Sequence, residues 1–393
     1  MTGPLTHVRV LDLSRIMAGP WAGQVLADLG ADVIKVERPG TGDDTRSWGP
    51  PFLGSESGYF LSANRGKRSV TADIATIEGR DLVRRLAATS DIVLENFKAG
   101  TLDRYGLGYE DLRAVKPDIV YCSITGFGQD GPRRDQAAYD FMIQAMGGLM
   151  SVTGEPDDRP GGGPQKVGVP IVDLFTGMYA ATGVLAALAH RDRTGEGDHI
   201  DLAMLDVQVG VLANQAMNHL ISGEVPVRRG NRHPNIQPQD VYPCRDGHLV
   251  VAVGNDAQFT RFCEALGFPE LAADPDYATN EARVRNVEAL TSRIRRTLAG
   301  GELSHWLREL GVRSVPCGPI NTVPMALADE QVRHRGMVRQ LPHPAEGAVP
   351  QVVSPLRFRN AALDFAAAPP LLGQHDDEIA RELGAEAVSG HNP

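Results

Sequence analysis

The chain has 393 residues, of which 42% are apolar and 22% charged, a composition typical of globular proteins that excludes a disordered or fibrous chain. Its 49 acidic residues outnumber the 39 lysines and arginines, so the net charge of −10 argues against a nucleic-acid partner bound through a broad basic face. The four cysteines form no paired motif and residues 1–10 show no signal-peptide pattern, so we expect a reduced, cytoplasmic protein.

Segments with strand-like and helix-like patterns alternate through the first half of the chain. Strands are predicted at residues 8–13, 31–37, 70–74, 91–97, 118–125 and 199–203. Helices are predicted at residues 19–29, 77–88, 109–115, 171–191 and 205–222. Strands that alternate with helices form parallel βαβ units, so we predict an α/β fold whose large domain is Rossmann-like in architecture.

The helix predicted at 171–191 is long and apolar, which is also a property of membrane-spanning helices. It contains Asp173, Thr176 and Gly177, and its end carries His190 and further charged residues. We therefore predict a helix buried inside the protein, with no membrane partner.

A change of composition after the first half predicts the domain boundaries. Residues 1–223 form the first part of the large domain, and residues 224–247, rich in proline, arginine and asparagine, form a linker. Residues 248–325 are predicted to form a small α+β domain. Its predicted elements are a strand at 248–254 and helices at 257–266, 280–298 and 301–310. Residues 326–393 are rich in proline and glycine, and we expect an extended return linker and tail that wraps around the body of the protein.

Residues 126–131 match the G-x-G-x-x-G pattern of dinucleotide-binding loops. However, Pro132 and charged residues follow where an apolar helix should begin, and no acidic residue ends a strand at the expected distance. We therefore favour a glycine-rich loop that packs against its neighbours. The chain contains no P-loop, no metal-binding spacing and no serine-hydrolase elbow, so no metal site is expected.

Asp173 interrupts the apolar run 167–177 at the predicted beginning of a helix. One interpretation is structural, because aspartate is a favoured N-cap residue. The other interpretation is catalytic: the helix dipole keeps the carboxylate ionised, apolar neighbours desolvate it, and an aspartate can form a covalent acyl intermediate. The two interpretations require the same position, so they do not exclude each other.

Residues 95–104 begin at the end of a predicted parallel strand, where α/β proteins bind ligands. Phe97 is suited to stacking on a planar base, and Lys98 and Arg104 are suited to pairing with phosphate. The alternative is a solvated loop with ordinary surface charges. Arg38, at the end of another predicted strand, has the same two interpretations.

Taken together, these motifs resemble the family III CoA-transferases, the family that includes formyl-CoA transferase and carnitine CoA-transferase. The resemblance covers nearly the whole chain and is carried by residues 9–14, 18–20, 29–39, 64–68, 95–97, 125–128 and Asp173. A closer similarity, to the branch that includes succinyl-CoA:glutarate (hydroxymethylglutarate) CoA-transferase, is carried by residues 42–52, 122–126, 242–243 and 369–375.

The resemblance implies a subunit of two domains, in which the C-terminal tail completes the Rossmann-like large domain, and a homodimer of two interlocked, ring-like subunits. It also implies a CoA-transferase that moves CoA from an acyl-CoA donor, expected to be succinyl-CoA, to a small dicarboxylic acid such as glutarate, hydroxymethylglutarate or itaconate. Acyl-CoA and a small carboxylic acid are then the partners of the enzyme. Coenzyme A is a substrate, and no other cofactor is expected.

The resemblance also assigns roles to individual residues. Asp173 matches the family's catalytic aspartate, which passes through aspartyl anhydride and aspartyl-CoA thioester intermediates. Positions that match the family's adenine and phosphate contacts are Arg38, Asn96, Phe97, Lys98 and Arg104, and Ile16 and Met204 match apolar wall positions. Tyr139 and Asp140 match positions beside the active site, although many members have glutamate where Asp140 stands.

A dicarboxylate acceptor needs a second cationic contact, and we expect Arg46 to supply it, because arginine pairs with a carboxylate through two hydrogen bonds. Two alternatives remain: an acyl-CoA racemase or isomerase with the same fold, and a non-catalytic acyl-CoA binding protein. The related racemases use a histidine at the position of Tyr139, and a tyrosine, with an ordinary pKa near 10, is poorly suited to that proton exchange.

Overall fold

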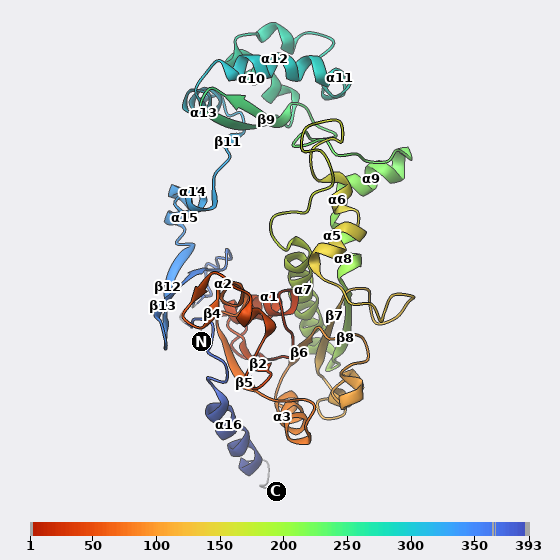
Figure 1. The fold of residues 1–393 in the computed structure, drawn as a ribbon, viewed down its shortest axis with the longest axis vertical. Helices are drawn as coiled ribbons and strands as arrows, with labels where there is room; N and C mark the ends of the chain where they lie inside the picture. Colours follow the sequence, from red (N-terminus) through yellow and green to blue (C-terminus); the bar gives the residue numbers. More distant parts are fainter. Residues whose placement is uncertain (1–2, 364, 366, 390–393) are drawn as a thin grey trace. The chain divides into compact units, whose positions relative to one another are not determined.

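The computed structural model describes residues 3–363, 365 and 367–389, and it divides into two compact units (Figure 1). The large unit contains the residues up to Leu149, Val167–Leu220 and the residues from Glu330 onward. The small unit contains Met150–Lys166 and Ile221–Asp329. The chain therefore passes back and forth between the two units more than once.

A sheet of six parallel strands forms the centre of the large unit. These strands are β1 (Arg9–Asp12), β2 (Asp32–Glu37), β5 (Lys67–Thr71), β6 (Ile92–Glu95), β7 (Val120–Thr125) and β8 (Asp198–Ala203). Their order is β5-β2-β1-β6-β7-β8, and every neighbouring pair is parallel. This is the doubly wound order of Rossmann-like folds, so the predicted α/β architecture is confirmed. The winding reverses between β1 and β6, and such a point is where α/β sheets bind ligands.

Helices cover both faces of the six-stranded sheet. The core of one face includes side chains of α1 (Ala18–Asp28) and α7 (Ile171–Thr194). The core of the other face includes side chains of α3 (Ile77–Ala88), α4 (Tyr109–Arg113) and α16 (Asp376–Ser389). Because successive residues of a strand point to opposite faces, each strand serves both cores, and β6 and β7 are buried at every position.

The remaining elements of the large unit are short. Its helical segments are η1 (Asp44–Ser47), α2 (Gly58–Ala63), η2 (Asp103–Tyr105), α5 (Asp140–Met146), α8 (Met204–Val211) and α15 (Glu330–His334). Two small antiparallel pairs are β3 (Phe52–Leu53) with β4 (Glu56–Ser57), and β12 (Val338–His343) with β13 (Gly347–Val352). The helices α6 (Leu149–Val152) and α9 (Ala213–Ser222) extend across the boundary residues of the two units.

The small unit has an antiparallel sheet of three strands in the order β11-β10-β9. The strands are β9 (Gln239–Cys244), β10 (Gly247–Ala252) and β11 (Cys317–Pro319). The helical segments are α10 (Asp256–Leu266), η3 (Pro269–Ala272), α11 (Asn280–Arg285), α12 (Val287–Ala299), α13 (Leu303–Val312) and α14 (Val323–Leu327). Its own core includes Phe259, Phe262, Ile294 and Leu310, which are at most 1% exposed.

The structure corrects several of the predicted elements. The predicted linker 224–247 contains the strand β9, because residues 239–244 pair with β10 and bury every second side chain, although proline and arginine surround them. The single helix expected at 205–222 breaks at Ala213, whose φ of 46° is left-handed. The tail, expected to be mainly loop, contains the pair β12–β13 and the helix α16.

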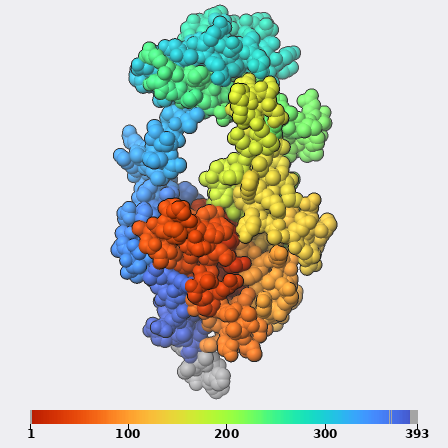
Figure 2. Space-filling model, viewed as in Figure 1, coloured from red at the N-terminus to blue at the C-terminus, as the bar shows by residue number. Residues whose placement is uncertain are grey.

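The C-terminal residues pack against the edge of the large sheet, and Figure 2 shows the blue C-terminal segment beside the red N-terminal one. Arg68 on the edge strand β5 forms ion pairs with Glu378 and Glu382 of α16. Asp376 accepts hydrogen bonds from both the backbone amide and the hydroxyl of Thr71, at 2.7 and 2.8 Å. These contacts cover an edge that would otherwise expose unpaired backbone groups.

The helix α7 is long and apolar enough to cross a membrane, by length and composition alone, yet it is a core helix of the large unit. It approaches α1 closely at Gly177, where a Cβ atom would lie 2.7 Å from the carbonyl oxygen of Ala18. Only glycine permits this approach. Since Asp173 lies one helical turn before Gly177, the close approach places Asp173 beside the beginning of α1.

We predict that Gly177→Ala lowers the free energy of unfolding by about 1–3 kcal/mol, because the added methyl group would overlap the backbone of α1. Gly183→Ala is the matched control on the same helix. Its methyl group would meet Ile200 at 3.6 Å, an ordinary contact, so we expect the higher helix propensity of alanine to add up to about 1 kcal/mol. Urea unfolding of both variants measures the difference, and equal effects would contradict the close approach.

Candidate active site

The turn between β1 and α1 has a strained backbone. Ile16 has a φ of 74°, a left-handed conformation that a β-branched residue rarely adopts and that costs about 1–3 kcal/mol. The carboxylate of Asp43 accepts the amide hydrogen of Ile16 at 3.3 Å. The side-chain amide of Asn96 bonds to both the backbone N–H and the carbonyl of Arg15, at 2.8 and 2.6 Å. The turn therefore presents Ile16 in a fixed position at the end of β1.

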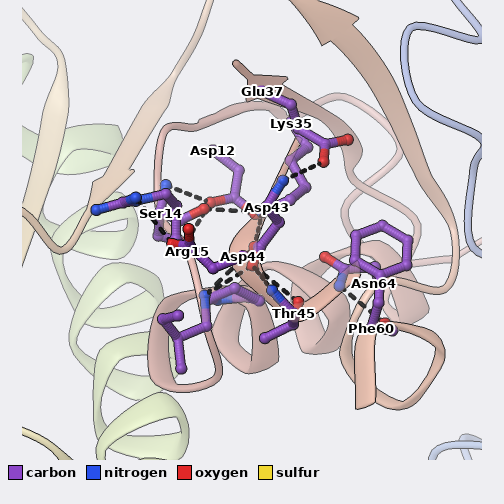
Figure 3. A network of polar contacts seen from close by, with 12 residues as sticks. Asp12, Ser14, Arg15, Lys35, Glu37, Asp43, Asp44, Thr45, Phe60 and Asn64 are labelled. Atoms are coloured by element: carbon purple, nitrogen blue, oxygen red, sulfur yellow. Dashed lines mark hydrogen bonds and ion pairs between the residues drawn. The ribbon is translucent and has the colours of Figure 1, made fainter. Parts of the chain in front are cut away.

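Two buried lysines, Lys35 and Lys67, support this turn through ion pairs, and Figure 3 shows the contacts of Lys35. Lys35 Nζ lies 2.9 Å from the Asp43 carboxylate and donates to the carbonyl of Ser14 at 2.8 Å, and the Lys35 and Asp43 side chains are fully buried. Burial acts to raise the pKa of Asp43, but the Lys35 ammonium and hydrogen bonds from Thr45 outweigh it and lower the pKa to about 2. Asp43 is therefore a permanent anion that holds the turn.

The second lysine, Lys67, supports the same turn from β5. Its ammonium lies 2.8 Å from Asp12 and donates to the carbonyl of Pro20 and the side chain of Asn64 at 2.9 and 3.0 Å. Burial lowers the pKa of Lys67 to about 8, against the attraction of Asp12. The network thus joins β1, β2, β5 and the beginning of α1 at one end of the sheet.

Arg46 does not have the free guanidinium that our prediction for the acceptor carboxylate required. It is 7% exposed and pairs with Glu37 through two hydrogen bonds of 2.7 and 2.8 Å. Its remaining contacts are Glu56 at 2.8 Å, the ring of Phe60 at 3.7 Å and the carbonyl of Pro370 at 3.2 Å. These contacts occupy the Arg46 guanidinium and connect η1, β4 and the tail. The geometry therefore argues against a contact between Arg46 and the acceptor carboxylate.

A cavity of about 220 Å³ opens at the carboxyl ends of β1, β2 and β6. Arg38 and Phe97, both predicted contacts of CoA, line it together with Arg15, whose guanidinium lies 5.5 Å from the centre of the Phe97 ring. Lys98 and Arg104 are exposed on the loop that follows β6 and do not line this cavity. The structure thus brings a cationic group and an aromatic ring together at the switch point of the sheet.

Asn96, whose contact with CoA stays a prediction, uses its side chain within the protein. Its amide is engaged with the backbone of Arg15 on both sides, so it fixes the turn that carries Arg15 and Ile16.

Met204 is the first residue of α8 and is buried in the core of one sheet face. Tyr139 precedes α5 and is 62% exposed.

Asp173 is the third residue of α7 and is 8% exposed. Within the described residues, its carboxylate receives no hydrogen bond, and no cation pairs with it. Burial, together with the charge of Asp140, raises the pKa of Asp173 to about 7. We had expected the helix dipole to keep this group ionised; instead, burial dominates and brings its titration close to neutral pH.

The helix α7 is capped by Asp140 and not by Asp173. One carboxylate oxygen of Asp140 accepts the amide hydrogens of Val172 and Asp173, at 2.8 and 3.3 Å. Its other oxygen accepts a hydrogen bond from Gln144, which in turn accepts the amide hydrogen of Val167. The structural interpretation of Asp173 as the N-cap is therefore wrong, and the Asp173 side chain is left without a capping role.

Sequence reasoning missed Tyr59, which lies on α2. Burial raises the pKa of its hydroxyl to about 12, with further contributions from the charges of Asp173, Asp140 and Asp43. Tyr59 therefore lies within electrostatic reach of Asp173 on α7, of Asp140 on α5 and of Asp43 in the turn network. Trp48 packs edge-on against it, with ring centres 5.3 Å apart. No local pattern could have found this tyrosine, because α2 and α7 are far apart in the sequence.

The glycine-rich loop 126–131 is a packing loop, as we favoured. A Cβ atom at Gly126 would lie 2.2 Å from the side chain of Ala138, and the amide of Gly128 donates to Thr125 at 2.8 Å. The next helix, α5, does not begin until Asp140. The loop thus lacks the helix N-terminus that binds a pyrophosphate. Among the described residues, no group of three His, Cys, Asp or Glu side chains is arranged to hold a metal ion.

Comparison with known proteins identifies relatives over almost the whole chain. The model of CoA-transferase family III matches residues 5–376. A succinate–glutarate CoA-transferase of Agrobacterium fabrum is 50% identical over 386 residues, which cover 97% of this chain and 96% of the relative. A succinyl-CoA:glutarate CoA-transferase of Mus musculus is 44% identical over 380 residues, which cover 97% of this chain and 86% of the relative.

A solved structure agrees with these matches. The crystal structure of a CAIB/BAIF family protein from Brucella suis superposes with a TM-score of 0.85 at 50% identity, over 98% of this chain and 100% of that one. The family match therefore extends over both sequence and fold. The chain belongs to CoA-transferase family III and is a CoA-transferase.

Proposed function

We propose that this enzyme moves CoA from succinyl-CoA to glutarate or a related small dicarboxylic acid, with Asp173 as the nucleophile. The observation that carries the proposal is the carboxylate of Asp173: it is buried, receives no hydrogen bond within the described residues and lies at the beginning of α7. The names of the two relatives support the donor and the acceptor. Hydroxymethylglutarate, a substituted glutarate, and itaconate, a shorter dicarboxylate with a methylene group, are further candidates for the acceptor.

The reaction proceeds by acyl exchange at Asp173. Its carboxylate attacks the thioester carbon of succinyl-CoA, the C–S bond breaks, and a mixed anhydride forms as CoA thiolate leaves. The thiolate then attacks the carbonyl carbon of Asp173, releasing succinate and leaving an aspartyl-CoA thioester. The acceptor carboxylate attacks this thioester, the C–S bond breaks, and a second anhydride forms as CoA thiolate leaves again. The returning thiolate attacks the acceptor's acyl carbon, which yields the new acyl-CoA and restores Asp173.

The surroundings of Asp173 suit this role. A carboxylate without hydrogen-bond donors is a stronger nucleophile than a solvated one, and burial protects an anhydride from water. Asp140 caps α7, so the carboxylate of Asp173 does not need to do so. The cavity lined by Arg38 and Phe97 supplies a cation for phosphate and a ring for adenine, with Lys98 and Arg104 exposed on the neighbouring loop.

We predict that Asp173→Asn lowers kcat for CoA transfer from succinyl-CoA to glutarate by on the order of a thousandfold or more, because an amide cannot form the anhydride. Asp206→Asn is the matched control, since Asp206 is also an acid in the first turn of a helix in the large unit but is exposed. We expect it to keep wild-type activity. Hydroxylamine trapping with succinyl-CoA, followed by mass spectrometry, should place the modification on Asp173.

A measurement of deuterium exchange, added to this experiment, separates the alternative functions. An isomerase would exchange the α-hydrogen of an acyl-CoA with deuterium without moving CoA, and a binding protein would do neither. Full transfer activity in Asp173→Asn, or a label on another residue, would contradict the proposed mechanism.

We predict that transfer activity rises with pH through about 7, because only the ionised form of Asp173 attacks and burial raises its pKa to about 7. Asp140→Asn should move this rise to lower pH, since it removes a negative charge that raises the pKa of Asp173. The asparagine oxygen can still cap α7. Asp140→Glu keeps the charge and serves as control. Profiles of kcat/KM against pH measure the shift, and identical profiles for Asp140→Asn and wild type would contradict the electrostatic coupling.

We also propose that the enzyme is an interlocked homodimer. Three large apolar side chains of α7, Phe175, Met178 and Tyr179, are 41%, 44% and 51% exposed, and a partner subunit is the usual cover for such a surface. We predict a dimer by mass photometry. Tagged and untagged dimers should not exchange subunits when mixed, because interlocked chains separate only by unfolding. A monomer, or free exchange, would contradict this proposal.

A further inference from the structure

Glu95 is a buried acid that the proposed mechanism does not use. It ends β6 and is 5% exposed, and it directly precedes Asn96 and Phe97. We infer that Glu95 is a positioning residue for acyl-CoA. The carboxyl group of Glu95 holds the backbone of Phe97, and it ties the loop that follows β6 (residues 96–105) to Ser123 and His199 inside the sheet. This inference rests on the proposed function, because it takes Phe97 as a contact of bound acyl-CoA.

The first contact lies within the loop itself. Glu95 Oε2 accepts the amide hydrogen of Phe97 at 2.8 Å, so the side chain turns back over the two residues that follow it. Phe97 then lines the cavity, together with Thr101, Leu102 and Tyr105 of the same loop. The position of one wall of the cavity thus depends on where the Glu95 carboxyl group is held.

A chain of side chains holds Glu95 in place. Ser123 on β7 is the partner of Glu95 in the parallel ladder, so its side chain lies beside the Glu95 carboxyl group and acts to lower the pKa of that group. The Ser123 hydroxyl oxygen lies 2.9 Å from His199 Nε2, on the next strand, β8. The His199 ring is fixed in turn between Tyr109, stacked at 4.8 Å, and Tyr121, edge-on at 5.3 Å. Three adjacent strands therefore contribute to one hydrogen-bonded row.

The direction in which hydrogen bonds are donated along the row depends on the protonation state of Glu95, because Ser123 has only one hydroxyl hydrogen to donate. When Glu95 is ionised, Ser123 donates to Glu95 and His199 Nε2–H donates to Ser123. When Glu95 is protonated, Glu95 can donate to Ser123, and Ser123 to His199. In both states one carboxyl oxygen still accepts the amide hydrogen of Phe97.

Burial and the charges around this row bring the pKa of Glu95 close to neutral pH, where the carboxyl group changes between these two protonation states. Burial raises the pKa of Glu95 to about 7, Asp103 and Asp201 add to this, and the hydrogen bonds from Ser123 and Phe97 oppose it. Burial lowers the pKa of His199, although four nearby acids act against this change. These acids are Asp201, Asp103, Asp198 and Glu110. A glutamine at position 95 could accept from Phe97 and donate to Ser123, as protonated glutamate does.

Steady-state kinetics with succinyl-CoA and glutarate test the inference. In Glu95→Ala, we expect KM for succinyl-CoA to rise about tenfold while kcat changes by less than about twofold, because a hydrogen bond that positions the loop is lost but Asp173 is untouched. Glu95→Gln should restore KM to within about twofold of wild type. Ser123→Ala should raise KM less than Glu95→Ala. Ser90→Ala, which deletes a buried hydroxyl before β6, is the matched control and should match wild type.

Several outcomes would overturn the inference. A wild-type KM in Glu95→Ala would do so, as would a Glu95→Gln variant with a KM as high as that of Glu95→Ala, or a loss confined to kcat. If Glu95→Ala does not fold, a wild-type KM in Ser123→Ala overturns the role of the row. Absence of CoA transfer in the wild-type enzyme would instead refute the proposed function, so the two failures are distinguishable.

Discussion

The buried ion pair between Lys35 and Asp43 is the interaction on which the rest of the site depends. Two fully buried charges are tolerated only when they are paired and hydrogen-bonded, and loss of one partner costs about 3–5 kcal/mol. Because Lys35 is fixed on β2, the pair holds Asp43 against the end of the sheet, and Asp43 holds the amide of Ile16. The strained turn, the wall of the cavity and the beginning of α1 all follow from this arrangement.

The packing of α7 on α1 connects this turn to the reactive carboxylate. Gly177 allows the two helices to approach at Ala18, the first residue of α1, and Asp173 lies one helical turn before Gly177. Asp140 accepts hydrogen bonds from the free amides at the beginning of α7. The Asp173 carboxylate therefore does not cap the helix, and it receives no hydrogen bond within the described residues. The charge of Asp140 also raises the pKa of Asp173, so the cap influences the protonation of the nucleophile.

Much of the architecture was predictable because strands and helices are local patterns. The alternation of apolar strands and amphipathic helices predicted the parallel sheet, and residues that follow β2 and β6 could be assigned to its ligand-binding edge. The predicted linker was wrong where β9 forms, because pairing with β10 overrides local composition. Tyr59 escaped prediction, because a short helix carries no pattern that relates it to Asp173.

The sequence by itself determined the order of elements, the apolar surroundings of Asp173 and the acidic and basic residues available to the site. The tertiary structure decided which of these charges are free. Asp140 caps α7 through an amide that lies 33 residues further along the chain, and Arg46 contacts a carbonyl 324 residues away. The availability of a charged group depends on the burial and pairing that folding imposes, and partners so distant in the chain leave no trace in a local pattern.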